Sequence, residues 1–149
     1  MAISSNDPML GQSPRRIPLV RILIGTLAAI VAATVVNVIV FSIGDAAGAF
    51  PDDFRFSAPG GETSMGVSNV VSTTITFLAL GGIVFAVISR LSSRPVRVFW
   101  YVAAVAFVLS LVTPFTIEDA PGDMIAVLLL LHLLAAVIGV WVMTRVATS

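Results

Sequence analysis

The chain has 149 residues, of which 58% are hydrophobic and 11% are charged, and it contains no cysteine. Eight basic and eight acidic side chains give a formal net charge of zero, and the mean hydropathy is +1.06. A soluble domain of this size carries about a quarter charged residues and somewhat under half apolar ones. The composition therefore excludes a disordered chain, a disulfide-stapled secreted domain and a basic nucleic-acid-binding protein, and it fits a small integral membrane protein.

Four stretches of the chain are apolar enough to cross a bilayer as helices, for which roughly 20 residues are needed. Residues 1–14 are polar and contain glycine and two prolines, so they predict a disordered N-terminal segment ahead of a single domain over 15–149. The predicted helices cover residues 19–43, 69–89, 96–113 and 124–144, and the longest connection covers residues 44–67. We expect an all-α, polytopic membrane protein folded as a bundle of four transmembrane helices.

Prolines and capping residues mark the ends of the predicted helices. Pro95 opens the third helix, where a missing N–H costs nothing, and Pro114 ends it, because the residue before a proline disfavours helix. Ser68 or Asn69 is expected to cap the second helix, and Asp123 the fourth.

The first predicted helix has features of a secretory signal peptide, because arginines precede it and Ala47-Gly48-Ala49 resembles a cleavage site. Its apolar run is longer than the roughly 7–15 residues of a signal-peptide core. We therefore expect an uncleaved transmembrane helix.

Most of the arginines and most of the acidic residues lie in different connections between the predicted helices. Seven of the eight arginines precede the first helix, join the second to the third or follow the fourth, and Asp7 is the only acid among them. The two other connections hold the remaining acids and Arg55. The positive-inside rule then places both termini in the cytoplasm and the acidic connections outside. Trp100, Tyr101 and Trp141 fall at the predicted cytoplasmic interface, where amphipathic rings are enriched.

Small residues recur along one face of each predicted helix. Membrane helices associate through close packing of such stripes, because lipid tails are as apolar as leucine. The stripes predict packing within the bundle, or contact with a second copy or another membrane protein, and their spacing does not separate these two uses. They are Gly25, Ala29, Ala33 and Asn37 in the first helix, Gly82 and Ala86 in the second, Ala103, Ala106 and Ser110 in the third, and Ala135, Ala136 and Gly139 in the fourth.

The predicted helices carry no carboxylate and no lysine, which excludes several kinds of chemistry. A small proton-coupled antiporter needs an intramembrane carboxylate. A chain without cysteine has no thiol relay and no thiolate metal site, and the single histidine supplies neither an H-E-x-x-H motif nor two haem ligands from one chain. We therefore predict a protein that is not an enzyme, with no catalytic residue, no metal site and no cofactor.

Polar residues from all four helices are expected at a similar depth. At a rise of 1.5 Å per residue, His132 lies roughly 13 Å and Asn37 roughly 10 Å below the outer ends of their helices. One interpretation is an outward-facing pocket for a small ligand, a proton or a cation; the other is that these groups only hydrogen-bond across helices and specify the bundle. The candidate site consists of His132, Asn37, Thr73, Thr74, Thr76 and Ser110, and its outer acidic rim of Asp45, Glu118, Asp119 and Asp123.

Three segments carry a resemblance to known proteins. They are Ala33-Thr34-Val35-Val36-Asn37, Leu131-His132-Leu133-Leu134-Ala135-Ala136, and the short connection from Thr113-Pro114-Phe115 to Asp123. With them the chain resembles an uncharacterised family of small bacterial four-helix membrane proteins, a domain of unknown function, from its first helix to its fourth. The resemblance implies a multi-pass protein of the bacterial inner membrane and supplies no activity.

The sequence leads us to expect a non-enzymatic inner-membrane protein that packs with or regulates a partner in the bilayer. That partner is either a second copy of the chain or another membrane protein, and nucleic acid is not expected. The alternative is a binding or transport module for a small ligand or cation at the polar layer. A third class, a membrane enzyme or redox subunit, would need a cofactor that this chain cannot ligate alone.

Overall fold

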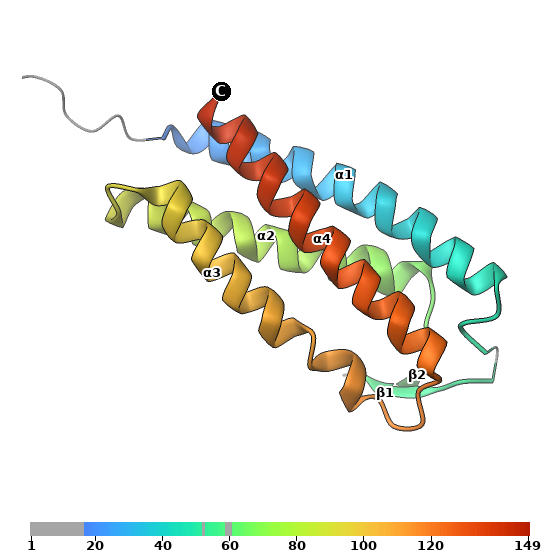
Figure 1. Ribbon diagram of the computed structural model, residues 1–149. Coiled ribbons are helices and arrows are strands. Elements are labelled where there is room, and N and C mark those ends of the chain that lie inside the picture. The colour runs from blue at the N-terminus through green and yellow to red at the C-terminus, as the bar shows by residue number, and fades with distance from the viewer. Residues whose placement is uncertain (1–16, 52, 59–60) are drawn as a thin grey trace, which may run out of the picture.

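The computed structural model describes residues 17–51, 53–58 and 61–149 (Figure 1). Its helices form an all-α bundle, which confirms the predicted fold class; residues 1–14, for which we predicted disorder, lie outside the described residues. The four helices are α1 (Leu19–Ala46), α2 (Val67–Leu91), α3 (Pro95–Ser110) and α4 (Gly122–Thr148). The shorter elements are the antiparallel strands β1 (Phe56–Ala58) and β2 (Gly61–Thr63) between α1 and α2, and the 3₁₀ turn η1 (Thr113–Thr116) after α3.

All four helices are long and apolar enough to cross a membrane, provided that η1 is counted with α3. Regular helix in this third segment ends at Ser110, earlier than predicted, and the chain continues through a turn into η1. Pro114 explains the change, because its ring and missing N–H prevent an α-helix from running through this position.

Two of the predicted helix caps are wrong. The N-cap of α2 is Gly66, because the helix begins at Val67, ahead of Ser68 and Asn69. The N-cap of α4 is Pro121, and Asp123 lies inside the first turn of that helix. There its Oδ1 accepts a hydrogen bond of 3.0 Å from the next backbone N–H, and its charge is favourably placed at the positive end of the helix dipole.

The helices pack as a ring in the order α1, α4, α3, α2. Helix α1 packs along α4 and along α2, and it lies diagonally across from α3. Helix α3 packs more sparsely, against α2 and α4, and Phe99 is its one buried residue. The third helix is therefore the least integrated member of the bundle.

Two apolar clusters fill the interior. In the first, Phe85 of α2 stacks on Phe99 of α3 with ring centroids 4.5 Å apart, next to Met143 of α4. In the second, Phe50 folds back from the long connection onto Phe41 of α1, with centroids 4.6 Å apart. The long connection is therefore tied to one end of the bundle by an aromatic contact.

Close approach of the helices depends on glycine at two positions. A Cβ atom added to Gly25 would lie 2.9 Å from the carbonyl oxygen of Met143, so α1 and α4 meet there almost backbone to backbone. A Cβ atom on Gly82 would lie 2.6 Å from Cγ2 of Thr26, where α1 meets α2. The small-residue stripe of α1 and the glycine of α2 are thus used within the bundle, as membrane helix packing requires.

The charged residues of the described chain gather at opposite ends of the bundle (Figure 1). The start of α1, the α2–α3 turn and the C-terminus lie at one end, and the β hairpin and the η1–α4 connection lie at the other. We call the first the basic end, which carries Arg21, Arg90, Arg94, Arg97 and Arg145. The other is the acidic end, which carries Asp45, Asp53, Glu62, Glu118, Asp119, Asp123 and also Arg55.

Candidate functional site

Asn37 and Thr74 are the members of the candidate site that the fold joins. The amide nitrogen of Asn37, a residue only 2% exposed, donates a hydrogen bond of 3.2 Å to Oγ1 of Thr74 across the α1–α2 contact. Oδ1 of Asn37 is buried without a hydrogen-bond partner among the described residues, and so is Oγ1 of Thr34 one turn earlier. A buried polar atom without a partner is costly, so these two oxygens mark a polar spot inside an apolar bundle.

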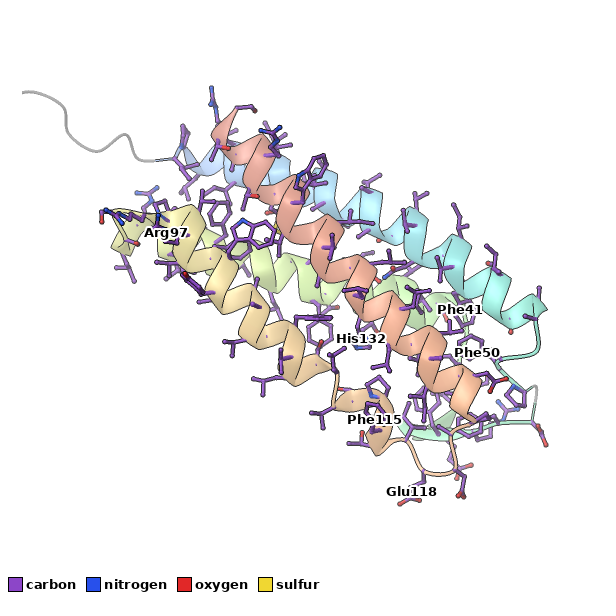
Figure 2. The ribbon with its side chains drawn as sticks, viewed as in Figure 1. Phe41, Phe50, Arg97, Phe115, Glu118 and His132 are labelled. Atoms are coloured by element: carbon purple, nitrogen blue, oxygen red, sulfur yellow. The ribbon has the colours of Figure 1, made fainter. Side chains whose placement is uncertain are left out.

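His132 points its ring back along its own helix. Its Nδ1 lies 2.7 Å from the carbonyl oxygen of Leu128. A carbonyl can only accept, so Nδ1 carries a hydrogen and donates it, while Nε2 makes no hydrogen bond within the described residues. The side chain is half-buried and lies between α4 and α3 in the view of Figure 2. Within the described chain it makes no hydrogen bond to Asn37 or Thr74.

The other polar residues of the predicted layer do not join the Asn37–Thr74 pair. Thr73 and Thr76 are exposed on the surface of α2, and Oγ1 of Thr76 donates to the carbonyl of Ser72 at 2.8 Å. Ser110 is half-buried on α3, where its hydroxyl donates to the carbonyl of Phe107 at 2.7 Å. The hydroxyls of Thr76 and Ser110 thus donate to backbone carbonyls of their own helices, as is usual for serine and threonine inside a helix.

The predicted acidic rim lies at the acidic end, and all four of its residues are exposed. Asp119 adopts a left-handed conformation, with φ of 54°, in the connection before α4, a region that aspartate tolerates better than most residues. Among the described residues, histidine and the acids form no group of three that could hold a metal ion. The rim is Asp45, Glu118, Asp119 and Asp123.

Sequence reasoning missed Thr34 as a member of the polar spot. It lies three residues before Asn37, and residues at this spacing are neighbours on a helix surface. This spacing is the signal in the sequence that links Thr34 to Asn37. The observed polar spot is therefore smaller than the predicted layer and centred on α1 and α2.

A second candidate surface lies on the outward side of α3. The small-residue stripe predicted for this helix is on the opposite side, the face of Phe99, and is not packed as it is in α1, because Ala103 is half-buried and Ala106 is exposed. Two shallow, open hollows lie on the surface of the described residues, and one of them is on the outward side of α3, lined by Ala104, Val105, Val108 and Leu109. The other is at the C-terminal end of α4, around Arg145. Neither hollow includes a residue of the polar spot.

Comparison with known proteins gives one match. A family model described as a family of unknown function (DUF6069) matches residues 18–149, which include all four helices and both candidate surfaces. No curated protein and no solved structure is significantly similar to the chain. The match confirms the resemblance to an uncharacterised family. The chain therefore belongs to DUF6069, a family whose function is unknown.

Proposed function

We propose that the chain is a non-enzymatic, multi-pass protein of a bacterial inner membrane that packs with a membrane partner through α3. Both termini then lie in the cytoplasm, and the acidic end lies outside. The separation of arginines from acids between the two ends of the bundle supports this orientation. The four apolar helices support insertion in a bilayer.

The observation that carries the proposal is the sparse packing of α3. Its outward surface includes the exposed small residue Ala104, whereas the outward surface of α1 presents large side chains such as Leu27 and Val31. Small residues let a second helix approach closely, and close approach is what drives helix association in lipid. The surface beside Ala104 is slightly hollowed between Val105, Val108 and Leu109.

The partner that fits this surface is a second copy of the chain. Exposed apolar residues follow one another on α3 at alternating spacings of three and four, the pattern of a helix that pairs with another helix. If this pattern is written as a heptad, its first position is valine in each repeat, and in parallel coiled coils β-branched residues at that position favour two strands. Two copies inserted in the same orientation present the stripe at the same depth, so the two stripes can form a dimer interface with twofold symmetry. The stripe consists of Val98, Tyr101, Val105 and Val108 of α3, and it continues to Val112 in the turn that follows the helix.

Disulfide cross-linking tests this contact cleanly, because the chain has no cysteine of its own. We expect Val105→Cys and Val108→Cys, both 62% exposed, to give a covalent dimer when membranes are oxidised. The matched control is Val31→Cys on α1, which is 64% exposed and outside the stripe. Cross-linking at Val31 as fast as at Val105, or none at either stripe position, would contradict the proposed contact.

A second candidate function is a binding module at the polar layer. Nε2 of His132, which makes no hydrogen bond within the described residues, and the unpartnered Oδ1 of Asn37 favour it. Imidazole nitrogen and carbonyl-type oxygen are acceptors, so the ligand would be a small cation or a hydrogen-bond donor.

Replacement of the histidine tests this second candidate. If the module exists, Zn²⁺ or another small cation raises the thermal unfolding temperature of the wild type, and His132→Ala abolishes the rise while leaving membrane insertion intact. Thr76→Val is the matched control, because Thr76 is exposed and bonds its own helix. An unchanged rise in His132→Ala would exclude the module.

A further inference from the structure

The basic end owes its positive charge to arginine alone, without lysine. All eight basic residues of the chain are arginine, and every described arginine except Arg55 is exposed at this end. Within the described chain no aspartate or glutamate lies there to pair with them. Arginine presents a planar fork of N–H donors that matches phosphate and carboxylate groups in pairs, which lysine does not.

Three of these arginines are concentrated in and beside the α2–α3 turn. Arg90 ends α2, Arg94 is the N-cap of α3 and Arg97 lies in the first turn of α3. Figure 2 shows the side chain of Arg97 reaching away from the helices at this end. Arg94 and Arg97 sit at the positive end of the α3 dipole, and no acid occupies that first turn. Cations in this position are unfavourable unless an anion offsets them.

Aromatic residues give the depth of this turn in a bilayer. Trp100 and Tyr101 are exposed one turn into α3, and such rings prefer the level of the lipid headgroups. The guanidinium groups that precede them then reach the level of the lipid phosphates. An anion held at that depth is a headgroup phosphate rather than a soluble ion.

We propose that the α2–α3 turn binds the phosphate of anionic phospholipids through Arg90, Arg94 and Arg97. A headgroup with net negative charge leaves its phosphate free for the guanidinium forks, whereas a choline headgroup brings its own cation. The site rests on the proposed insertion of the helices in a bilayer, but it needs neither the α3–α3 contact nor the polar layer, so failure of that contact would leave it intact.

Lipid titration followed by native mass spectrometry tests the site. The probe is phosphatidylglycerol added to the detergent-solubilised full chain, and the variant is the triple change Arg90→Gln, Arg94→Gln and Arg97→Gln. Each basic group near a membrane surface contributes roughly a fivefold gain in binding, so we expect about a hundredfold loss for all three. The matched control Arg55→Gln removes one exposed arginine at the acidic end and is expected to bind like the wild type.

Three further binding measurements test what the site recognises. The triple arginine-to-lysine variant keeps its charge but loses the guanidinium forks, so we expect it to bind more tightly than the glutamine variant and more weakly than the wild type. Binding equal to the wild type would contradict recognition by the forks. Phosphatidylcholine is expected to bind weakly, and equal binding would contradict selection of anionic lipids. Millimolar inorganic phosphate is expected not to compete, and full competition would show that the site takes soluble phosphate instead. A glutamine variant that binds phosphatidylglycerol like the wild type would overturn the site.

Discussion

Replacing Phe99 by alanine is expected to lower the free energy of unfolding by about 3–5 kcal/mol, the usual cost of emptying a buried aromatic site. Phe99 is 3% exposed and stacks on Phe85, which is 0% exposed, so its loss leaves a cavity between α2 and α3. It is also the one buried residue of α3. The variant therefore loosens the helix that we propose as the partner-binding surface.

The neighbouring residue supplies the control for this prediction. Trp100 is 45% exposed, and Trp100→Ala is expected to cost less than about 1 kcal/mol because it removes no core contact. Denaturant unfolding in micelles, followed by circular dichroism, measures both variants. Equal losses for Phe99 and Trp100 would mean that α3 is not anchored in the bundle as described.

Gly82→Ala is the second substitution with a large expected effect, a loss of about 1–3 kcal/mol through overpacking. The new Cβ would lie 3.0 Å from Cβ and 2.6 Å from Cγ2 of Thr26. Thr26 is branched at Cβ, and its hydroxyl donates a hydrogen bond of 2.8 Å to the carbonyl oxygen of Ile22. Its side chain therefore has little freedom to rotate away from the new methyl group. Relief of this steric clash would require α1 and α2 to move apart.

Gly81 is the matched control for Gly82, because it is the adjacent residue on the same helix. A Cβ atom there would meet only Cε of Met143, at an ordinary contact distance of 3.8 Å. Gly81→Ala is therefore expected to leave unfolding unchanged or slightly favour the fold, since alanine is the better helix former. Thermal unfolding of the two variants side by side distinguishes them, and equal stability would refute the close α1–α2 approach.

The helices of this fold were predictable because a bilayer imposes a length on each span. Long uncharged stretches and prolines at their ends were enough to place four helices. The hairpin of β1 and β2 was not predicted, although the sequence has a Pro-Gly dipeptide between the two strands, which is a turn signal. Its strands are too short for periodicity to be visible.

The sequence predicts how deep the residues of the candidate site lie in the bilayer, but not the direction in which each side chain points from its helix. Thr73, Thr74 and Thr76 share a depth, yet successive residues of a helix point about 100° apart, and only Thr74 faces α1. The exposure of α3 was equally hidden from the sequence. In a soluble helix a polar face marks the outside, whereas a membrane helix is apolar on the inside and on the outside.

The mass of the protein released intact from lipid nanodiscs tests the central claim most directly. We predict a species of twice the 15.6 kDa chain mass, which converts to the chain mass when Val105 and Val108 are both replaced by bulky tryptophan. Persistence of the chain mass alone for the wild type at every protein-to-lipid ratio would contradict a partner contact between copies through α3.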